Sequence, residues 1–123
     1  MSQQHVEQTA ARVLLVEDEM LPSMVMEDAL TELGCCVRKA ARLPKALQLA
    51  ISEKFTFAVL DVNLDGERVF PVAAALRERK VPFLFSSGYG DSSIPPEYRD
   101  CKVLQKPYGM ESFRQAVQVL LGR

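Results

Sequence analysis

The sequence predicts an α/β fold in which helices cover both faces of a five-stranded parallel sheet. Short apolar runs alternate with amphipathic stretches along the chain of 123 residues, and no linker-like segment interrupts them from Arg12 onward. This alternation is typical of a doubly wound sheet, because each crossover between parallel strands needs a helix to return the chain. We expect the common strand order 2-1-3-4-5.

The five strands are predicted from apolar or β-branched runs at 13–16, 36–40, 55–60, 81–85 and 101–105. Helices are predicted between and after them from four sets of apolar residues at helical spacing: Leu21, Met24, Val25, Ala29 and Leu33; Leu43, Ala46, Leu47, Ala50 and Ile51; Val69, Ala73 and Leu76; and Met110, Phe113, Ala116, Val117, Leu120 and Leu121.

Two loop segments carry strong local signals. Asp65 and Gly66 predict a turn at the start of the third helix. Residues 90–100 contain the adjacent prolines Pro95 and Pro96, so we expect a short, irregular fourth helix there.

Composition limits the class of protein. Residues 1–11 are polar and aperiodic, so we expect a flexible N-terminal tail followed by one domain at 12–123. The net charge of −1 gives no global field for nucleic acid or an anionic membrane, and no apolar run is long enough to span a bilayer. The three cysteines lack metal-ligand spacing, and reduced thiols favour the cytoplasm; a Cys35–Cys36 redox switch is the alternative.

Chemically useful side chains follow several predicted strands. Glu17, Asp18 and Glu19 come directly after the first strand, and Asp61 ends the third. Ser86 and Ser87 follow the fourth strand, and Lys106 follows the fifth. Ligands of open parallel sheets gather beyond the carboxyl ends of the strands, so these side chains should share one rim.

Clustered carboxylates at that rim need a counter-ion, and hard oxygen ligands select Mg²⁺ or a similar cation. A lysine and a hydroxyl at the same point would complete the contacts that phosphoryl transfer requires. Asp61 is then a nucleophile able to form an acyl phosphate. The sequence has no Gly-rich phosphate loop, so the phosphoryl group is not expected to be part of a bound nucleotide.

From Arg12 onward the chain resembles the receiver domain of bacterial two-component response regulators, which has a flavodoxin-like fold. The residues that carry the resemblance are VLLVEDE (13–19), AVLDVNLDG (58–66), FLFSSGYGD (83–91) and VLQKPY (103–108). Each segment lies at the carboxyl end of a predicted strand with receiver-like spacing.

The resemblance assigns a phosphoacceptor and a metal site. Asp61 matches the phosphoacceptor, and Asp18 matches the carboxylate that binds Mg²⁺, or Mn²⁺, directly. Glu17 matches the acidic neighbour that acts through a bound water, a position where many receivers have Asp. Asn63 matches the position whose backbone carbonyl completes the metal shell, and Asp61 also contributes to that shell.

The resemblance also assigns the residues around the phosphoryl group. Lys106 matches the lysine that pairs with the phosphoacceptor, and Pro107 implies a cis peptide that aims this lysine inward. FSSGYG is similar to the FAT-G-hydrophobic-Tyr variant of receivers, which makes Ser87 the switch hydroxyl. Gly88 then leaves room for a phosphodonor to approach.

Two positions concern the output of the switch. Val103 replaces the aromatic residue that usually lies three positions before the lysine, so the ordinary coupling of hydroxyl shift to aromatic rotation cannot operate here. Tyr89 either covers the site or contacts a partner at the output face.

These assignments predict a stand-alone, phosphorylated signalling switch rather than an enzyme. The expected phosphodonor is a sensor histidine kinase or a histidine phosphotransfer protein, and the expected output is a phosphorylation-dependent protein contact or phosphorelay transfer to an unknown partner. Two alternatives stay open: a degenerate receiver that binds its partner constitutively, and an aspartate-based phosphohydrolase. Against the second, Asn63 occupies the position of the general acid.

Overall fold

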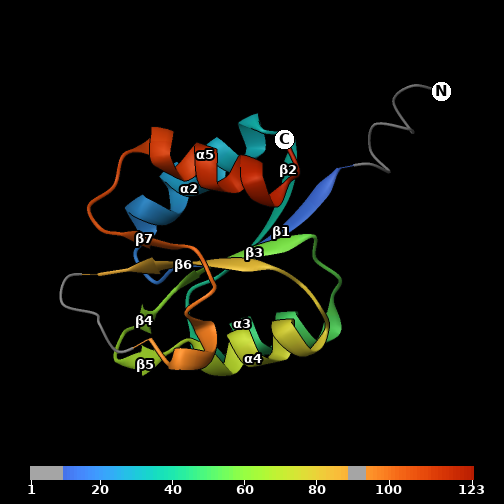
Figure 1. Cartoon of the computed structure of the whole chain (residues 1–123), viewed down its shortest axis with the longest axis vertical. Helices are drawn as coiled ribbons and strands as arrows, with labels where there is room; N and C mark the ends of the chain where they lie inside the picture. The colour runs from blue at the N-terminus through green and yellow to red at the C-terminus, as the bar shows by residue number, and fades with distance from the viewer. Residues whose placement is uncertain (1–9, 89–93) are drawn as a thin grey trace.

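The observed sheet confirms the predicted architecture. The structure is a computed structural model that describes residues 10–88 and 94–123. Five parallel strands lie in the order β2-β1-β3-β6-β7, which is 2-1-3-4-5 along the chain (Figure 1). Their bounds are Ala11–Val16 (β1), Cys35–Ala40 (β2), Phe57–Asp61 (β3), Phe83–Ser87 (β6) and Val103–Gln105 (β7). β1 therefore begins one residue before the predicted start of the domain at Arg12.

Helices cover both faces of this sheet (Figure 1). One face carries α2 (Met20–Glu32) and α5 (Met110–Leu120), and the other carries α3 (Leu43–Ser52) and α4 (Phe70–Glu78). None of the helices in the described part of the chain has the length and apolar character that crossing a bilayer requires.

The core consists of two apolar clusters, one on each face of the sheet. Every residue of β3 is buried, as are the last four of β1, because helices cover these central strands on both sides. On the α2 and α5 side the largest buried side chains include Leu30, Phe57 and Phe113. On the α3 and α4 side they include Leu14, Leu76 and Phe85.

The predicted apolar set of α2 is confirmed at Ala29 and Leu33 and is wrong in the first turns of the helix. Its buried residues are Ser23, Met26, Ala29 and Leu30, whereas Leu21 is 73% exposed and Met24 and Val25 are about half exposed. Apolar residues surround the first turns of this helix, so their spacing does not determine which side packs against the sheet. The predicted stripe of α5 is confirmed, because Phe113, Ala116 and Val117 are buried in the core.

A small hairpin follows β3 and was not predicted. β4 (Asn63–Leu64) pairs antiparallel with β5 (Glu67–Arg68), and Asp65 and Gly66 form the loop between them. Both loop residues have positive φ, +53° and +92°, which is the type I′ geometry that suits a two-residue hairpin. The predicted turn is therefore correct, but α4 begins only at Phe70.

The predicted fourth helix is short, as expected. Among residues 94–102 the helical structure is a single 3₁₀ turn, η1 (Pro96–Tyr98). Its Tyr98 is buried against the α4 face of the sheet, stacked on Phe70 with a centroid distance of 5.8 Å. The guanidinium of Arg77 lies 5.0 Å from the centre of the Tyr98 ring, so the aromatic residue and the cation hold η1 to α4.

Candidate functional site

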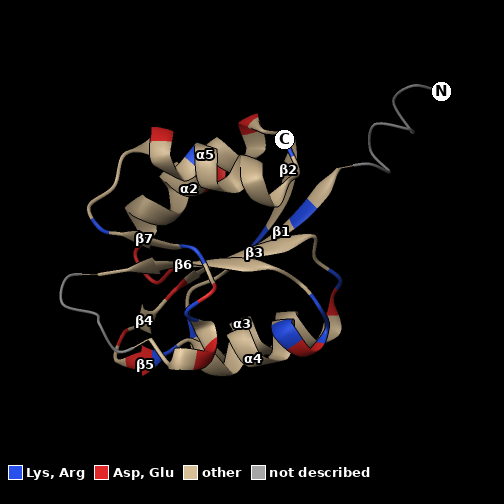
Figure 2. Ribbon diagram, viewed as in Figure 1, with Lys and Arg blue, Asp and Glu red and all other residues tan. Residues whose placement is uncertain are grey.

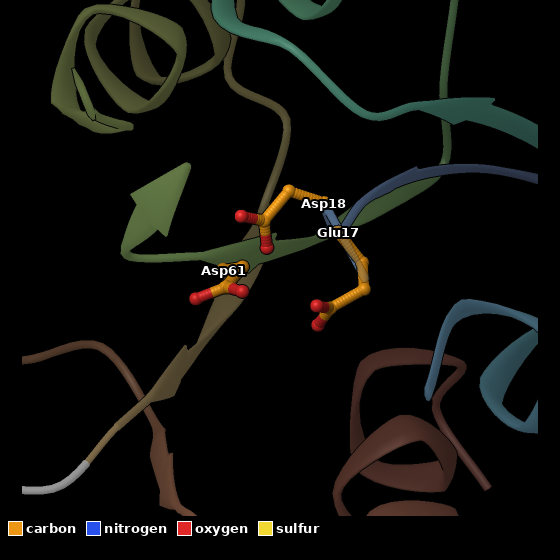
Figure 3. A group of neighbouring side chains, drawn as sticks. All are labelled: Glu17, Asp18 and Asp61. Carbon is orange, nitrogen blue, oxygen red and sulfur yellow. The ribbon is translucent and has the colours of Figure 1, made fainter. Parts of the chain in front are cut away.

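Three carboxylates converge at the carboxyl ends of the central strands (Figure 3). Asp61 is the last residue of β3, and Glu17 and Asp18 directly follow β1. These strands are neighbours in the sheet, with Val16 opposite Leu60. One oxygen from each of the three carboxylates lies within 4.8 Å of the other two. The predicted acidic cluster is therefore assembled.

Glu17 is a carboxylate buried in the protein, with 3% exposure. One of its oxygens accepts a hydrogen bond from the Glu19 backbone N–H at 3.1 Å, and the other lies 3.5 Å from the Lys106 ammonium. Burial, together with the nearby charge of Asp61, raises the pKa of Glu17 from 4.5 to about 7. Near neutral pH this side chain therefore exchanges readily between its charged and neutral forms.

Asp61 is held between two donors. Its Oδ1 accepts a hydrogen bond from the Asn63 backbone N–H at 3.2 Å, and its Oδ2 lies 3.2 Å from Nζ of Lys106. The residue is 4% exposed, and burial raises the pKa of its carboxyl group even though Lys106 opposes this shift. Burial would lower the pKa of Lys106, but Asp61 and Glu17 raise it above its usual value, so the lysine stays charged.

The end of β7 delivers Lys106 to this cluster. Its backbone N–H donates to the carbonyl of Ser87 at 2.8 Å, which continues the pairing of β6 with β7 past the last strand residue. The peptide bond between Lys106 and Pro107 is cis, as expected.

The β4–β5 hairpin supports the third carboxylate. Oδ2 of Asp18 accepts the backbone N–H of Asp65 at 3.0 Å, so the loop of the hairpin orients Asp18. The side chain of Asp65 points elsewhere, pairing with Arg42 at 3.2 Å. Within the same turn, the side-chain oxygen of Asn63 accepts the Gly66 N–H at 2.9 Å. Asn63 therefore uses its side-chain oxygen within the turn.

Ser87, the serine expected to supply the switch hydroxyl, lies on β6 beside the acidic cluster. Ser86 is the register partner of Asp61, and Ser87 is the final residue of the strand. Both serines are buried, and the Ser87 hydroxyl lies 3.4 Å from the carbonyl oxygen of Gly88. Among the described residues other than its chain neighbour, no atom lies within 4 Å of a Cβ added at Gly88. Tyr89 lies outside the described residues.

Val103 is half-buried and packs against the cluster on the α3 and α4 face. The aromatic side chains of that face come from other elements. Tyr98 of η1 contacts Phe70 of α4 and lies edge-on to Phe85 of β6 at 5.7 Å. Aromatic contact with the strand that carries Ser87 is therefore present, but it comes from η1 and α4 and not from β7.

Tyr108 is a residue near the site to which the sequence analysis assigned no role. Its hydroxyl lies 2.9 Å from the Ser86 hydroxyl and 3.6 Å from the sulfur of Met26. Burial raises its pKa. The sequence does contain one indication of this contact. Tyr108 lies two residues after Lys106, and the hydroxyl of a partly buried tyrosine usually has a hydrogen-bond partner.

Figure 2 shows acidic and basic residues along the ribbon of both helical layers, so among the described residues neither sign of charge is gathered in one layer. The geometry of this rim is that of a buried, lysine-paired aspartate beside two further carboxylates. Such a site can bind a small cation through oxygen ligands, and it can present a carboxylate oxygen to an electrophile.

No protein-family model matches the chain. Solved structures do. SdrG from Sphingomonas melonis Fr1 is 38% identical, with 91% of this chain and 97% of that chain covered and a TM-score of 0.78. SdrG in its BeF₃-activated conformation matches at the same 38% identity, with coverages of 92% and 98% and a TM-score of 0.74.

Two further structures are similar. The REC domain of the response regulator PhyR from Erythrobacter litoralis is 27% identical over 94% of this chain and 93% of that chain, with a TM-score of 0.76. The receiver domain of the sensor histidine kinase PA1611 from Pseudomonas aeruginosa PAO1, solved with a magnesium ion in its active-site cleft, is 21% identical over 94% and 100%, with a TM-score of 0.72. This last similarity shows the fold alone.

Proposed function

Because this chain belongs to the receiver domains of response regulators, we propose that it accepts a phosphoryl group on Asp61 and so acts as a switch in two-component signalling. One observation carries the assignment of Asp61. Of the two buried carboxylates in the cluster, Asp61 at the end of β3 lies nearer to Lys106, at 3.2 Å against 3.5 Å for Glu17.

The proposed reaction is the transfer of a phosphoryl group from a phosphohistidine of the donor protein. A carboxylate oxygen of Asp61 attacks phosphorus, and the P–N bond breaks with its electron pair going to the imidazole nitrogen, which takes up a proton. The product is an aspartyl phosphate. Lys106 is charged beforehand and lies beside the nucleophile, so it can pair with the phosphoryl oxygens as they arrive. We propose that the Ser87 hydroxyl donates a hydrogen bond to one of the same phosphoryl oxygens.

The donor set fits Mg²⁺ or Mn²⁺. Each of the three carboxylates already has an oxygen in a hydrogen bond to a backbone N–H: Glu17 to Glu19, Asp18 to Asp65, and Asp61 to Asn63. One-oxygen binding suits the small octahedral Mg²⁺ better than Ca²⁺, which often takes both oxygens of a carboxylate. When bound, the ion would neutralise charge between the carboxylates and the phosphoryl group. Asp18, Asp61 and the Asn63 carbonyl would hold it directly, and Glu17 through water.

We propose a sensor histidine kinase or a histidine phosphotransfer protein as the phosphodonor. The output would be a protein contact that depends on phosphorylation, or onward transfer of the phosphoryl group. Val103 and Tyr98 both lie on the α3 and α4 face of the sheet. We expect a partner that binds this face to meet the aromatic ring of Tyr98 from η1, and not an aromatic residue at position 103 of β7.

The test is labelling with a small phosphodonor. Incubation with acetyl phosphate and Mg²⁺ should add one phosphoryl group per chain, observed by intact mass. The added group should be lost on treatment with base or with hydroxylamine, both of which cleave an acyl phosphate. Asp61→Asn should abolish the addition. The matched control is Asp65→Asn, which changes an exposed aspartate of the neighbouring hairpin and should label like the parent. Equal labelling of parent and Asp61→Asn would contradict the assignment.

A further inference from the structure

A hydrogen bond between Ser86 and Tyr108 joins the middle of the sheet to the loop that follows Lys106. The two hydroxyl oxygens are 2.9 Å apart. Ser86 is almost completely buried and pairs in register with Asp61 on one side and Leu104 on the other. The bond therefore starts from the strand position next to the proposed phosphoacceptor.

The ring of Tyr108 has a defined position. It stacks on Phe113 of α5, with centroids 6.3 Å apart and planes 16° from parallel. Its hydroxyl also reaches the sulfur of Met26 in α2 at 3.6 Å. Because the stacked ring fixes the direction of the hydroxyl, the hydrogen bond to Ser86 can fix the backbone that carries Tyr108.

Lys106 lies between two attachments to β6. Its own N–H bonds to the Ser87 carbonyl at 2.8 Å, and two residues later Tyr108 bonds to Ser86. The lysine ammonium is carried on a flexible four-carbon stem, so its position depends on how firmly the backbone of Lys106 is held. The two attachments hold that backbone on both sides of the residue that contacts Asp61.

We infer that Tyr108 is a positioning residue which, through its hydrogen bond to Ser86, keeps Lys106 aligned with Asp61 for phosphoryl transfer. The inference rests on the proposed function and extends it to two residues outside the set of expected site residues. The hydroxyl is the atom that matters, since phenylalanine would retain the stacking on Phe113 and lose only the contacts of the hydroxyl with Ser86 and the Met26 sulfur. Ser86→Ala removes the first of these contacts and leaves the second in place.

The test compares Tyr108→Phe, Ser86→Ala and the double variant in labelling by acetyl phosphate with saturating Mg²⁺. Loss of one net hydrogen bond corresponds to roughly a two- to tenfold effect, so each single variant should label about that much more slowly. The double variant should be no slower than the singles, because both remove the same bond. Ser52→Ala, which removes a hydroxyl that bonds to the Gln48 carbonyl in α3 on the opposite face of the sheet, should label at the parental rate.

Two further measurements separate positioning of Lys106 from a general loss of structure. In a Lys106→Ala background, adding Tyr108→Phe should slow the residual labelling no further. Mg²⁺ affinity measured by calorimetry should stay within about twofold of the parent in Tyr108→Phe, because the metal ligands lie on other elements.

Parental labelling rates in Tyr108→Phe would overturn the inference while leaving the proposed function standing. The inference would also be overturned if Tyr108→Phe slowed labelling as much in the Lys106→Ala background as in the parent. It would be overturned as well if Tyr108→Phe weakened Mg²⁺ binding by the same factor as it slowed labelling. A parent protein that is not labelled at all, or is labelled equally in Asp61→Asn, would overturn the proposed function and this inference with it.

Discussion

Replacing Glu17 by glutamine should stabilise the metal-free protein at neutral and higher pH. Glu17 is buried beside Asp61, and its pKa in the folded protein is about 7 instead of 4.5. Between these two values the folded protein holds a proton that the unfolded chain has released. The free energy of unfolding therefore falls as the pH rises through that window, and the neutral glutamine removes this loss.

The size of the effect follows from the two pKa values. A difference of one in pKa corresponds to about 1.4 kcal/mol, so the change from 4.5 to about 7 amounts to roughly 3 kcal/mol at full ionisation. Glutamine also loses the charge interaction with Lys106, whose ammonium lies 3.5 Å from Glu17, and this reduces the gain. We expect Glu17→Gln to be more stable than the parent by about 1–3 kcal/mol at pH 8 and by much less at pH 5.

Urea unfolding in EDTA at pH 5, 6, 7 and 8 measures the difference. Glu19→Gln is the matched control, since it neutralises an exposed carboxylate two residues away and should leave stability nearly unchanged at every pH. Mg²⁺ should narrow the gap between Glu17→Gln and the parent by binding the folded parent. The reasoning fails if Glu17→Gln is no more stable than the parent at pH 8, or if the gap does not widen between pH 5 and pH 8.

Three further substitutions test other parts of the structure. Gly66→Ala places a side chain at φ +92° in the hairpin that orients Asp18, so it should cost about 1 kcal/mol in urea unfolding and weaken Mg²⁺ binding in calorimetry. Phe113→Ala empties a fully buried position under α5 and should cost about 3–5 kcal/mol in the same unfolding assay; a cost below 1 kcal/mol would contradict the packing. Arg77→Ala removes the cation over Tyr98 and the hydrogen bond to the Glu97 carbonyl, so it should speed amide hydrogen exchange in η1 while β1 stays protected.

The centre of the sheet was predictable because β1, β3 and β6 are buried on both faces and therefore read as nearly uninterrupted apolar runs. The acidic cluster was predictable for a related reason. Charged residues that interrupt such runs, Glu17 and Asp61 among them, must lie where the strands emerge from the core, and neighbouring parallel strands emerge at the same rim. Lys106 reaches that rim by the same rule.

Other features depend on packing that no periodicity records. The start of α2 is apolar on several sides, so its spacing could not show that Leu21 faces outward. The hairpin after β3 has strands of two residues each, too short to give an alternating pattern, although Asp65-Gly66 did mark its turn. The bond of Tyr108 to Ser86 joins residues 22 apart in the chain, and only the folded structure brings them together.

The burial of Asp61 bears on how the proposed switch would respond over time. With 4% of its surface exposed, the carboxylate has little contact with solvent, and within the described residues Glu17 and Lys106 lie directly beside it. We expect a phosphodonor and a hydrolytic water to approach the same buried side chain by the same route. Substitutions that widen this route should therefore accelerate both the gain and the loss of the phosphoryl group. Such substitutions would shorten the time in which the fraction of phosphorylated protein responds to a change in the supply of phosphodonor. They would have less effect on the fraction that is phosphorylated at steady state.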